Sequence, residues 1–575
     1  MPAVTDTSLA CPKQGHCPGC PLGAEPYADG LAKKGRGLAG ALAPYTSLAP
    51  ELLAPRAASP TLAYRLRAKL VSHGQSLGLF ERGSHRVVDV TDCRVLSPAL
   101  TRTSVAMRRL LPLPIYAADL RETSEGVLVT LLTEQAGAQR ALETAARALV
   151  EQGEALSVAS SVRRPGDVRL LASEPALVAG PPSARHALSE GAPYAYAAHG
   201  GFVQAHAAQA GYVYAALARA VRDQLAGSEP SVLELFAGNG SLALALSKSG
   251  ARVTAVEAYA PAIALAERAA REQGLELRAV ASDATRFMQT TRGERFDAVI
   301  VNPPRRGLPP ELRAAIARTA PRLLAYVSCD PHTLARDAWH LQRLGLSLER
   351  AEPLDMIPWS DAIEALCWFR AGEPPAPRVL FEDEQSLAVE KAPHESSAEG
   401  RDDVGSLCAR VRRLPGSAAA VALESWGDGV SGVCWFAKSS AAADALRERV
   451  SGERELVVLA RGNLRKQGTV TRRGPGDPAR GARYRKQADA GRHSLLTVFT
   501  ADRDETGTLS DFASIRHPVL GDAAYGDAAT NHFVQHRHGL DRSFLHVRTS
   551  RLGSAEARSE LTPDLARVVA SLGSD

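Results

Sequence analysis

The chain has 575 residues, of which 45% are hydrophobic and 23% are charged. These values are ordinary for packed globular domains and exclude a mainly disordered chain, a collagen-like chain and a membrane bundle. At about 100–200 residues per domain, the length predicts roughly three or four domains. The formal net charge is +5, a weak basic excess that permits a nucleic-acid partner without requiring one.

Eight cysteines are spread along the chain, too few for a disulfide scaffold of this length. They stand at positions 11, 17, 20, 93, 329, 367, 408 and 434. The first residues lack a basic stretch followed by an apolar core, so we expect no signal peptide. Because no run of eighteen apolar residues occurs, we also expect no membrane-spanning helix. These features predict a cytoplasmic protein whose clustered cysteines serve as metal ligands or nucleophiles.

Four regions of different texture follow one another along the chain. Residues 1–60 are rich in Gly, Pro and Ala and carry three of the cysteines. Residues 61–190 alternate short apolar runs with polar breaks, which predicts strands and hairpins. Residues 191–372 alternate strand and helix patterns, which is typical of a doubly wound α/β sheet. A Pro-rich linker then leads into residues 378–575, a second region of mixed α+β pattern.

Three of the first four cysteines form the pattern C-x5-C-x2-C, at Cys11, Cys17 and Cys20, and Cys93 follows far downstream. Four thiolates can close a tetrahedral zinc site or hold an iron–sulfur cluster. The spacing does not choose between them, because zinc sites usually have two C-x2-C pairs and this chain has one. The pattern therefore predicts a metal site, with unrelated surface thiols as the alternative.

The segment SVLELFAGNGSLALAL predicts a strand, a glycine-containing turn and the start of a helix. Gly238 and Gly240 would let the backbone approach a ligand at the helix N-terminus. Glu257 ends the next predicted strand, where a carboxylate suits the two hydroxyls of a ribose. Asn302 ends a further strand and precedes two prolines that hold the backbone extended. The combination fits S-adenosylmethionine better than a dinucleotide; a packing turn and a surface glutamate are the alternative.

Several segments together resemble the RNA uracil-C5 methyltransferases of the RumA/RumB/TrmA superfamily. The resemblance rests on C-x5-C-x2-C, YRLRAKL, GLFERGSHRVVDVTDCRVL, NPPRRG and SCDPHTLARD. It implies an α/β fold with a Rossmann-like domain at 191–372 that binds S-adenosyl-L-methionine. It also implies an iron–sulfur region at 1–60 and an RNA-contacting β-rich region at 61–190. The implied donor contacts are Gln204, Phe236, Gly238, Glu257 and Asn302. The implied ligands of a [4Fe–4S] cluster are Cys11, Cys17, Cys20 and Cys93.

The same resemblance assigns the reacting groups. Cys329 follows an apolar strand, where a lone cysteine is more often an inert buried thiol, but its motif matches the catalytic segment of the family. Because C5 of uracil is a poor nucleophile, a thiolate must first add to C6 and make C5 carbanion-like. A general base must later remove the C5 proton, and Glu364 in DMIPWSDAIEALCWF matches that position. Trp359 and Ala362 stand where histidines are common in the family.

Three neighbouring residues are expected to be structural. We expect Arg336 and Asp337 to cap a helix rather than to orient substrate, and Cys367 to belong to a packed core. Two further features favour the RumB (RlmC) branch. Asn302 stands where most of the superfamily has Asp, and Cys11 comes too early for an additional N-terminal RNA-binding barrel. That branch implies 23S rRNA as the substrate.

The C-terminal region contains VLFEDEQSLAVEKAPH, GVSGVCWFAKSSAAADAL, HPVLGDAAYGD and FLHVRTSRL. On these segments, most of residues 378–575 resembles an RluA-type pseudouridine synthase. Aligned on that family's catalytic segment, Gly427 stands where the nucleophilic Asp is expected, and Asp428 comes one residue late. Leu456 stands where the family has an active-site Tyr, and the segment 506–513 has lost an Arg. These departures predict a retained fold without isomerase activity, in which Cys408 and Cys434 are packing residues.

The positive charge is concentrated in residues 461–492. This block carries a net charge of +8, so the rest of the chain nets −3. Gly and Pro interrupt the block, which predicts a basic loop that binds RNA phosphates, with a solvated insertion as the alternative.

The resulting hypothesis is methylation of C5 of a uridine in RNA, with 23S rRNA as the first candidate. A tRNA-specific enzyme is one alternative. A second is a bifunctional enzyme in which Asp428 restores isomerisation, and a third is a non-catalytic RNA-binding assembly factor. We expect RNA as the partner, no membrane, and no obligate protein partner.

Overall fold

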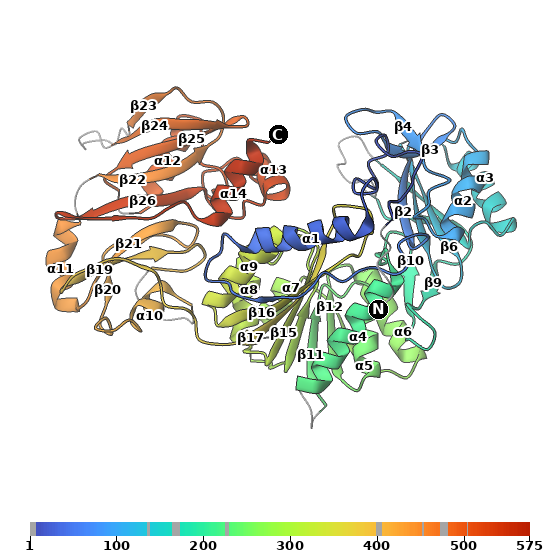
Figure 1. The fold of residues 1–575 in the computed structure, drawn as a ribbon, viewed down its shortest axis with the longest axis horizontal. Helices are drawn as coiled ribbons and strands as arrows, with labels where there is room; N and C mark the ends of the chain where they lie inside the picture. The colour runs from blue at the N-terminus through green and yellow to red at the C-terminus, as the bar shows by residue number, and fades with distance from the viewer. Residues whose placement is uncertain are drawn as a thin grey trace.

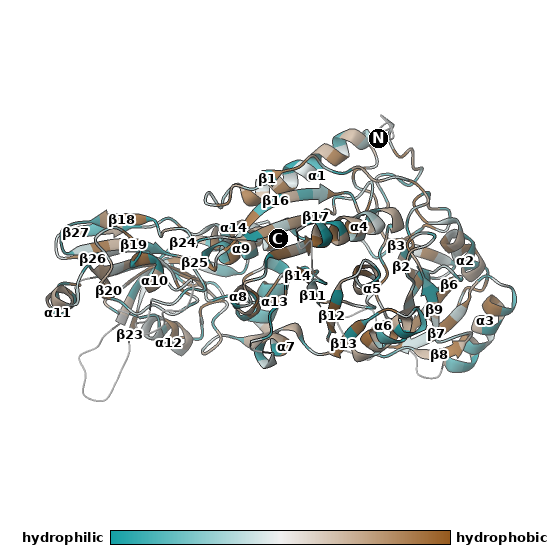
Figure 2. Cartoon of the chain, turned by 90° about the horizontal axis from the view of Figure 1, so that it is seen from below, coloured by the Kyte–Doolittle hydropathy of each residue, from teal (hydrophilic) through white to brown (hydrophobic). Residues whose placement is uncertain are grey.

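The structure is a computed structural model in which three parts lie in a row (Figure 1). It describes residues 7–134, 138–163, 173–224, 229–291, 293–397, 405–450, 453–471, 481–502 and 504–574. A seven-stranded, an eight-stranded and a ten-stranded sheet form the cores of the three parts, and a two-stranded sheet lies beside the first. Figure 2 shows the same elongated arrangement from below, with the eight-stranded sheet in the middle.

The central sheet has the strand order β1-β16-β17-β15-β14-β11-β12-β13. Its five parallel neighbours are β11 (Ser231–Leu235), β12 (Arg252–Glu257), β13 (Leu277–Ala281), β14 (Ala298–Val301) and β15 (Leu323–Ser328). β17 (Glu364–Ala371) joins them antiparallel between β15 and β16 (Leu346–Leu354). Every residue of β14 and β15 is buried, as expected for parallel strands covered on both faces. The predicted doubly wound α/β sheet is confirmed.

Helices cover both faces of this sheet. One apolar core contains residues of α4 (Ala207–Gln224), α5 (Ser241–Lys248) and α6 (Ala260–Glu272). The core on the opposite face contains residues of α1 (Tyr27–Leu42), α7 (Ala284–Thr290), α8 (Pro310–Arg318) and α9 (Pro331–Arg343). Cys367 is fully buried in the second core, which confirms its packing role.

The N-terminal residues contribute to the central part as well as to the cysteine region. β1 (Glu51–Leu52) pairs parallel with β16 at the sheet edge. In α1, the buried Lys34 pairs with Asp355 at 2.5 Å, and the Tyr27 hydroxyl donates to the same carboxylate at 2.8 Å. Burying a lysine is costly unless it is paired, so this contact fixes α1 against the loop that precedes β17. Residues 1–60 therefore belong partly to the central part and partly to the cysteine region, instead of forming the single region that we expected.

The β-rich part contains the sheet β4-β3-β2-β5-β6-β7-β8. Its strands are β2 (Arg67–His73), β3 (Ser76–Phe80), β4 (Val87–Asp89), β5 (Ala117–Glu122), β6 (Val127–Thr133), β7 (Ser157–Val162) and β8 (Ala176–Ala179). Helices α2 (Pro98–Arg109) and α3 (Gln139–Glu151) pack against it in one apolar core. The hairpin of β9 (Ser183–His186) and β10 (Ala195–Ala198) leads from this sheet into α4.

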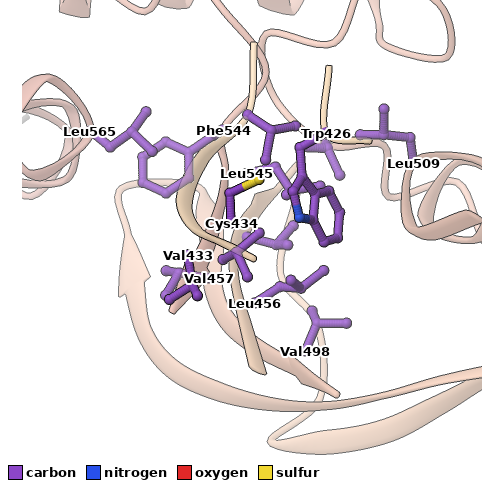
Figure 3. Packing of buried hydrophobic residues seen from close by; sticks show 14 of the residues in the cluster. Trp426, Val433, Cys434, Leu456, Val457, Val498, Leu509, Phe544, Leu545 and Leu565 are labelled. Atoms are coloured by element: carbon purple, nitrogen blue, oxygen red, sulfur yellow. The ribbon is translucent and has the colours of Figure 1, made fainter. Parts of the chain in front are cut away.

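The C-terminal part is built on a sheet whose main path is β18-β19-β21-β26-β22-β25-β24-β23. Its strands are β18 (Val379–Glu382), β19 (Ser386–Lys391), β20 (Val421–Ala422), β21 (Ser431–Ala437), β22 (Arg454–Ala460), β23 (Gln467–Thr471), β24 (Gly481–Ala490), β25 (His493–Thr500), β26 (Leu545–Leu552) and β27 (Ala555–Arg558). Its helices are α10 (Leu407–Val411), α11 (Ser440–Arg449), α12 (Thr506–Ser514), α13 (Ala528–His538) and α14 (Pro563–Leu572). Cys408 and Cys434 are buried in its core, where Figure 3 shows Cys434 among aromatic and aliphatic side chains. Their packing role is confirmed.

The basic block corrects one expectation. Its described residues 461–466 and 491–492 lie outside the strands. Residues 467–471 and 481–490 form β23 and β24, which pair with each other, and β24 also pairs with β25. The prediction of a loop is wrong for the residues of these two strands, because hydrogen bonding between β23, β24 and β25 outweighs the local Gly signals. Residues 472–480 of the block, with Arg472, Arg473, Asp477 and Arg480, lie outside the described residues. Within the described part of the chain, the helices are all too short or too polar to cross a membrane.

Candidate active site

The predicted reacting groups meet at one edge of the central sheet. Strands β11, β14 and β15 are parallel neighbours, so the residues that follow them share an edge, as predicted for Asn302 and Cys329. β17 runs antiparallel to β15, with Ser328 paired to Ala365. Cys329 follows Ser328 and Glu364 precedes Ala365, so this register places Cys329 opposite Glu364.

Burial and neighbouring charges shift the pKa values of Cys329 and Glu364. Burial, together with the neighbouring Glu364 carboxylate, raises the pKa of the Cys329 thiol to about 11, against the lowering effect of Arg305. Burial also raises the pKa of Glu364 to about 7, again against the lowering effect of Arg305. The Arg305 guanidinium thus stabilises the anionic forms of both groups. Sequence reasoning did not assign Arg305, although its place in NPPRRG, three residues after Asn302, was the available signal.

A cavity at the same sheet edge brings together four of the five predicted donor contacts. Gln204, Phe236, Gly238 and Asn302 line it. Phe236 has a φ of +64°, a left-handed conformation that costs energy for a residue with a side chain and is concentrated at functional sites. Gly238 has a φ of +57°, and a Cβ added there would meet no atom within 4 Å. The backbone at Gly238 therefore leaves open space beside the cavity.

Gly240 has a different role from the one expected. It precedes α5 with a φ of +74°, and a Cβ added there would lie 2.5 Å from the Cβ of Ala266 in α6. Because the close approach of α5 and α6 leaves no room for a side chain, Gly240 serves helix packing. The expectation that it opens the backbone to a ligand is corrected.

Glu257, the fifth predicted donor contact, stands at the end of β12. One carboxylate oxygen accepts from the Gly238 N–H at 3.0 Å, and the other accepts from the Tyr259 N–H at 2.9 Å. The carboxylate thus holds the glycine turn in shape. Its role as a ribose contact stays a prediction.

Glu234 is a cavity residue that sequence reasoning missed. It lies within β11, lines the same cavity as Phe236, and is 4% exposed. Burial raises the pKa of its carboxyl to about 8. Its Oε2 atom is buried with no hydrogen-bond partner among the described residues. The signal was a charged residue inside the otherwise apolar run VLELF.

The loop before Glu364 is anchored to the N-terminal residues. Trp359 is buried with a φ of +69°, and its indole N–H donates to the Thr61 carbonyl at 2.9 Å. Its ring meets the Tyr27 ring edge-on at 5.2 Å, and its carbonyl accepts from the Leu22 N–H at 2.9 Å. Trp359, where the family commonly has His, therefore packs this loop against the cysteine region.

Arg336 and Asp337 do not cap a helix. The N-cap of α9 is Asp330, whose side chain accepts from the His332 and Thr333 N–H groups. Asp337 is fully buried in the middle of α9 and accepts from the Leu308 N–H at 2.7 Å and the Tyr326 hydroxyl at 3.0 Å. The expected capping role is wrong, because Asp330 already occupies the helix start.

The four N-terminal cysteines are brought together from positions far apart in the sequence. Cys11, Cys17, Cys20 and Cys93 line one small cavity. Burial, with the charges of the neighbouring thiols, raises the pKa of Cys20 to about 12 and raises that of Cys17. Among the described residues, no group of three or more His, Cys, Asp or Glu side chains is arranged so that it could hold a metal ion. The structure thus gathers the four thiols without fixing what they bind.

The expected catalytic positions of the C-terminal part are also visible. The Gly427 N–H donates to Glu505 at 3.0 Å, and a Cβ at 427 would lie 2.0 Å from the other Glu505 oxygen. Asp428 is exposed and lines a separate cavity. Leu456 is fully buried, and Figure 3 shows it beside Trp426 and Val498. A carboxylate thus occupies the space of a side chain at position 427.

Comparison with known proteins identifies the family of this chain. A model of the methyltransferase small domain matches residues 215–325, a range that begins within α4 and ends within β15. A 23S rRNA (uracil(1939)-C(5))-methyltransferase, RlmD, of Pseudomonas fluorescens is 30% identical over 375 residues, 63% of this chain and 80% of that protein. The chain belongs to the RNA uracil-C5 methyltransferase family.

Relatives from two branches of the family match this methyltransferase. A 23S rRNA (uracil(747)-C(5))-methyltransferase, RlmC, of Shewanella baltica is 36% identical over 153 residues, which is 26% of this chain and 39% of that protein. The crystal structure of the Pyrococcus abyssi tRNA (uracil-54, C5)-methyltransferase with S-adenosyl-L-homocysteine superposes with a TM-score of 0.51 at 21% identity. It covers 61% of this chain and 86% of that protein. The enzyme is thus an S-adenosylmethionine-dependent RNA (uracil-C5)-methyltransferase with a Rossmann-like fold and additional β-rich regions.

Proposed function

We propose that this methyltransferase modifies C5 of a uridine in 23S rRNA, with Cys329 as nucleophile and Glu364 as base. The observation that carries the proposal is the register of β15 and β17, which sets the two residues opposite each other at the sheet edge that also bears Asn302. The ribosomal substrate is supported by the RlmD and RlmC relatives, which act on 23S rRNA.

The chain's own residues perform the steps around methyl transfer. The Cys329 thiolate forms a bond to C6, and the C5–C6 double-bond electrons move into the uracil carbonyl as an enolate. Gln204, Phe236 and Asn302, which line the cavity, would hold S-adenosylmethionine. The donor would supply the methyl group: the C5–CH3 bond would form as the S–CH3 bond breaks, and S-adenosylhomocysteine would leave. Glu364 then accepts the C5 proton, the C5–C6 double bond re-forms, and the C6–S bond breaks to release the thiolate. The target base reaches this edge by leaving its stack, as chemistry on a base generally requires.

We propose that Cys11, Cys17, Cys20 and Cys93 hold a [4Fe–4S] cluster. The donor set fits, because four partly buried thiols line one cavity and none of the four is in a disulfide. Thiols with pKa values raised by burial, as for Cys17 and Cys20, need a bound cation to become thiolates. The cluster would supply a structural crosslink between residues 11–20 and the strand that ends near Cys93.

We further propose that residues 378–575 form a pseudouridine-synthase-like domain without isomerase activity, which assists RNA binding. The support is local: Gly427 has no side chain to act as nucleophile, and Glu505 fills its space. Asp428 is exposed towards another cavity. If in vitro RNA treated with the enzyme gained pseudouridine, and Asp428→Ala abolished that gain, the bifunctional alternative would hold instead.

The decisive experiment is to map 5-methyluridine across rRNA and tRNA in cells with and without this chain. Loss of one 23S rRNA methylation, restored by the wild-type chain and not by Cys329→Ala, supports the proposal. Loss of a tRNA methylation instead would establish the tRNA-specific alternative. Unchanged methylation in both RNAs, with no binding of S-adenosylmethionine, would favour an assembly factor.

A further inference from the structure

A buried charge network joins the methyltransferase part to the C-terminal part. Asp541, just before β26, lies 3.2 Å from Arg336 Nη1 in α9 and 3.3 Å from Arg313 Nη2 in α8. The Arg313 side chain is fully buried, and those of Arg336 and Asp541 are 8% and 10% exposed. On its other side, Asp541 meets His394 at 3.6 Å. One carboxylate of the C-terminal part is thus shared by two arginines of the methyltransferase part.

The two arginines also hold Asp337. Arg336 Nη2 lies 2.9 Å from Asp337 Oδ1, and Arg313 Nη1 lies 3.2 Å from the same atom. The network therefore balances two guanidinium groups with two carboxylates. Removing one partner of a buried ion pair leaves an uncompensated charge that the protein must relieve by moving or hydrating it. Neutralising Asp541 would therefore disturb Arg336 and Arg313 as well as removing the ion pairs that it makes.

The network continues into the segment 302–308, the NPPRRGL loop after β14. Arg336 Nη2 donates to the Arg306 carbonyl at 2.8 Å, and the Thr333 hydroxyl donates to the Arg305 carbonyl at 3.0 Å. Asp337 accepts from the Leu308 N–H at 2.7 Å. Residues of α9 thus hold three backbone positions of this loop, and Arg336 is both a loop contact and a partner of Asp541.

The loop carries groups that line the predicted donor cavity or influence the predicted reacting groups. It begins with Asn302, which lines that cavity. Burial raises the pKa of both Cys329 and Glu364, and Arg305 acts against that rise in each. A short chain of contacts therefore runs from Asp541 through Arg336 to the backbone beside Arg305. Displacements of about 1 Å at a reacting centre can cost as much as ~100-fold in rate.

We propose that Asp541 is a positioning residue for methyl transfer, through which the C-terminal part fixes the NPPRRGL loop beside Cys329. This inference rests on the proposed roles of Cys329 and Asn302. It assigns the C-terminal part a function in the reaction that is independent of isomerase chemistry.

The test compares Asp541→Asn with Asp541→Glu in the full chain. Asp541→Asn keeps the shape and removes the charge, so we expect the single-turnover rate of methyl transfer to RNA to fall about tenfold or more. We expect KM for RNA and the dissociation constant for S-adenosylmethionine to change less than about threefold, because neither site is touched directly. Asp541→Glu keeps the charge and should recover a substantial part of the rate.

The matched control is Glu424→Gln. Glu424 is buried and pairs with Arg454 at 2.7 Å within the C-terminal part, so this variant also breaks a buried ion pair but leaves the domain boundary intact. A rate for Asp541→Asn within twofold of the wild type would overturn the proposal. A fall no larger than that of Glu424→Gln at equal folded fraction would overturn it as well, because the effect would then be one of stability.

A second measurement needs no RNA. We expect iodoacetamide to alkylate Cys329 several-fold more slowly in Asp541→Asn than in the wild type, because Arg305 would no longer stabilise the thiolate. Peptide mass spectrometry measures the alkylation rate. An unchanged alkylation rate would overturn the inference. Cys329 of the wild-type chain could be alkylated as expected while the enzyme transferred no methyl group to uridine in RNA. The proposed function would then fail, but the alkylation comparison would still decide whether Asp541 positions the loop beside Cys329.

Discussion

Cys329 and Glu364 face each other across the antiparallel pair of β15 and β17 in the central sheet, where Ser328 is paired with Ala365. The proposed nucleophile and the proposed base thus come from strand ends held in one register. Burial raises the pKa of both groups, and Arg305 acts against that rise in each, so one cation favours the anionic forms that the proposed mechanism requires.

Replacement of the nucleophile should stop the reaction before methyl transfer. We expect Cys329→Ala to bind S-adenosylmethionine with wild-type affinity and to transfer no methyl group from labelled donor to rRNA. The reason is that C5 is not nucleophilic without an adduct at C6. Wild-type enzyme should form a covalent complex with RNA containing 5-fluorouridine, and Cys329→Ala should not. Cys367→Ser is the control, and a normal methylation rate in Cys329→Ala would refute the mechanism.

Glu364 should give the reaction a pH dependence near neutrality. It acts as a base only when ionised, and burial raises its pKa to about 7, so the rate should rise with pH through about 7. Glu364→Gln should lower the rate by about 10²–10⁴-fold and accumulate a methylated covalent adduct. The further rise in rate at higher pH, which comes from ionisation of the Cys329 thiol, should persist in this variant. If Glu364→Gln retained both the rate and the inflection near pH 7, another group would be the base.

The same raised pKa predicts an effect on stability. A carboxyl whose folded-state pKa lies above its unfolded value binds more protons when folded, so its contribution lowers stability as pH rises from about 4.5 towards 7. Glu364→Gln should remove this loss. We therefore expect its Tm to exceed that of the wild type at pH 8, measured by calorimetry, and the difference to shrink at pH 5.

Substitutions of the two glycines in the turn after β11 should affect different properties of the enzyme. Gly240→Ala places a methyl group 2.5 Å from the Ala266 Cβ, and overpacking of this kind typically costs about 1–3 kcal/mol in stability. Gly238→Ala meets no atom within 4 Å but stands at a φ of +57°, so strain alone should lower its stability, by less than strain and overpacking together lower that of Gly240→Ala. Because Gly238 lines the cavity, we also expect its dissociation constant for S-adenosylmethionine to rise about tenfold, or ~1.4 kcal/mol. Calorimetric Tm and donor titration separate the two. Equal effects on both quantities would contradict the assignment.

The proposed cluster gives a compositional prediction. Anaerobically purified enzyme should contain iron and acid-labile sulfide, with broad visible absorbance that Cys20→Ser strongly reduces. The control Cys434→Ser should retain both, because Cys434 lies in the core of the C-terminal part. Zinc without sulfide in the wild type would establish the tetrahedral zinc alternative.

The basic residues just before β23 and on β24 should contribute to RNA affinity by neutralising phosphates. Arg465 and Lys466 are exposed just before β23, and Arg485 is exposed on β24. Replacing all three with Gln should weaken RNA binding and flatten its salt dependence by about one unit of slope for each phosphate that is no longer neutralised. Substitution is preferable to deletion, because β24 is paired with β25 and its removal would expose a strand edge. An unchanged salt slope would leave the strands without a role in binding.

Local sequence patterns were sufficient to predict much of the central part. Strand residues such as those of β14 and β15 are apolar throughout because both faces are buried, and the residues that follow them, Asn302 and Cys329, must share an edge in a parallel sheet. The turn after β11, with Phe236 and Gly238, was likewise evident from its glycines. Periodicity, proline and glycine act over a few residues, so a single sequence carries this information directly.

Contacts between distant segments required the tertiary structure. Lys34 meets Asp355, and Arg336 meets Asp541 some two hundred residues later, and each pairing exists because a buried charge must find an opposite one wherever the fold supplies it. For the same reason Asp337 is a network residue rather than a cap, and Glu505 occupies the space over Gly427. Side-chain identity made these partners available, while the arrangement of the three parts in space decided which of them met.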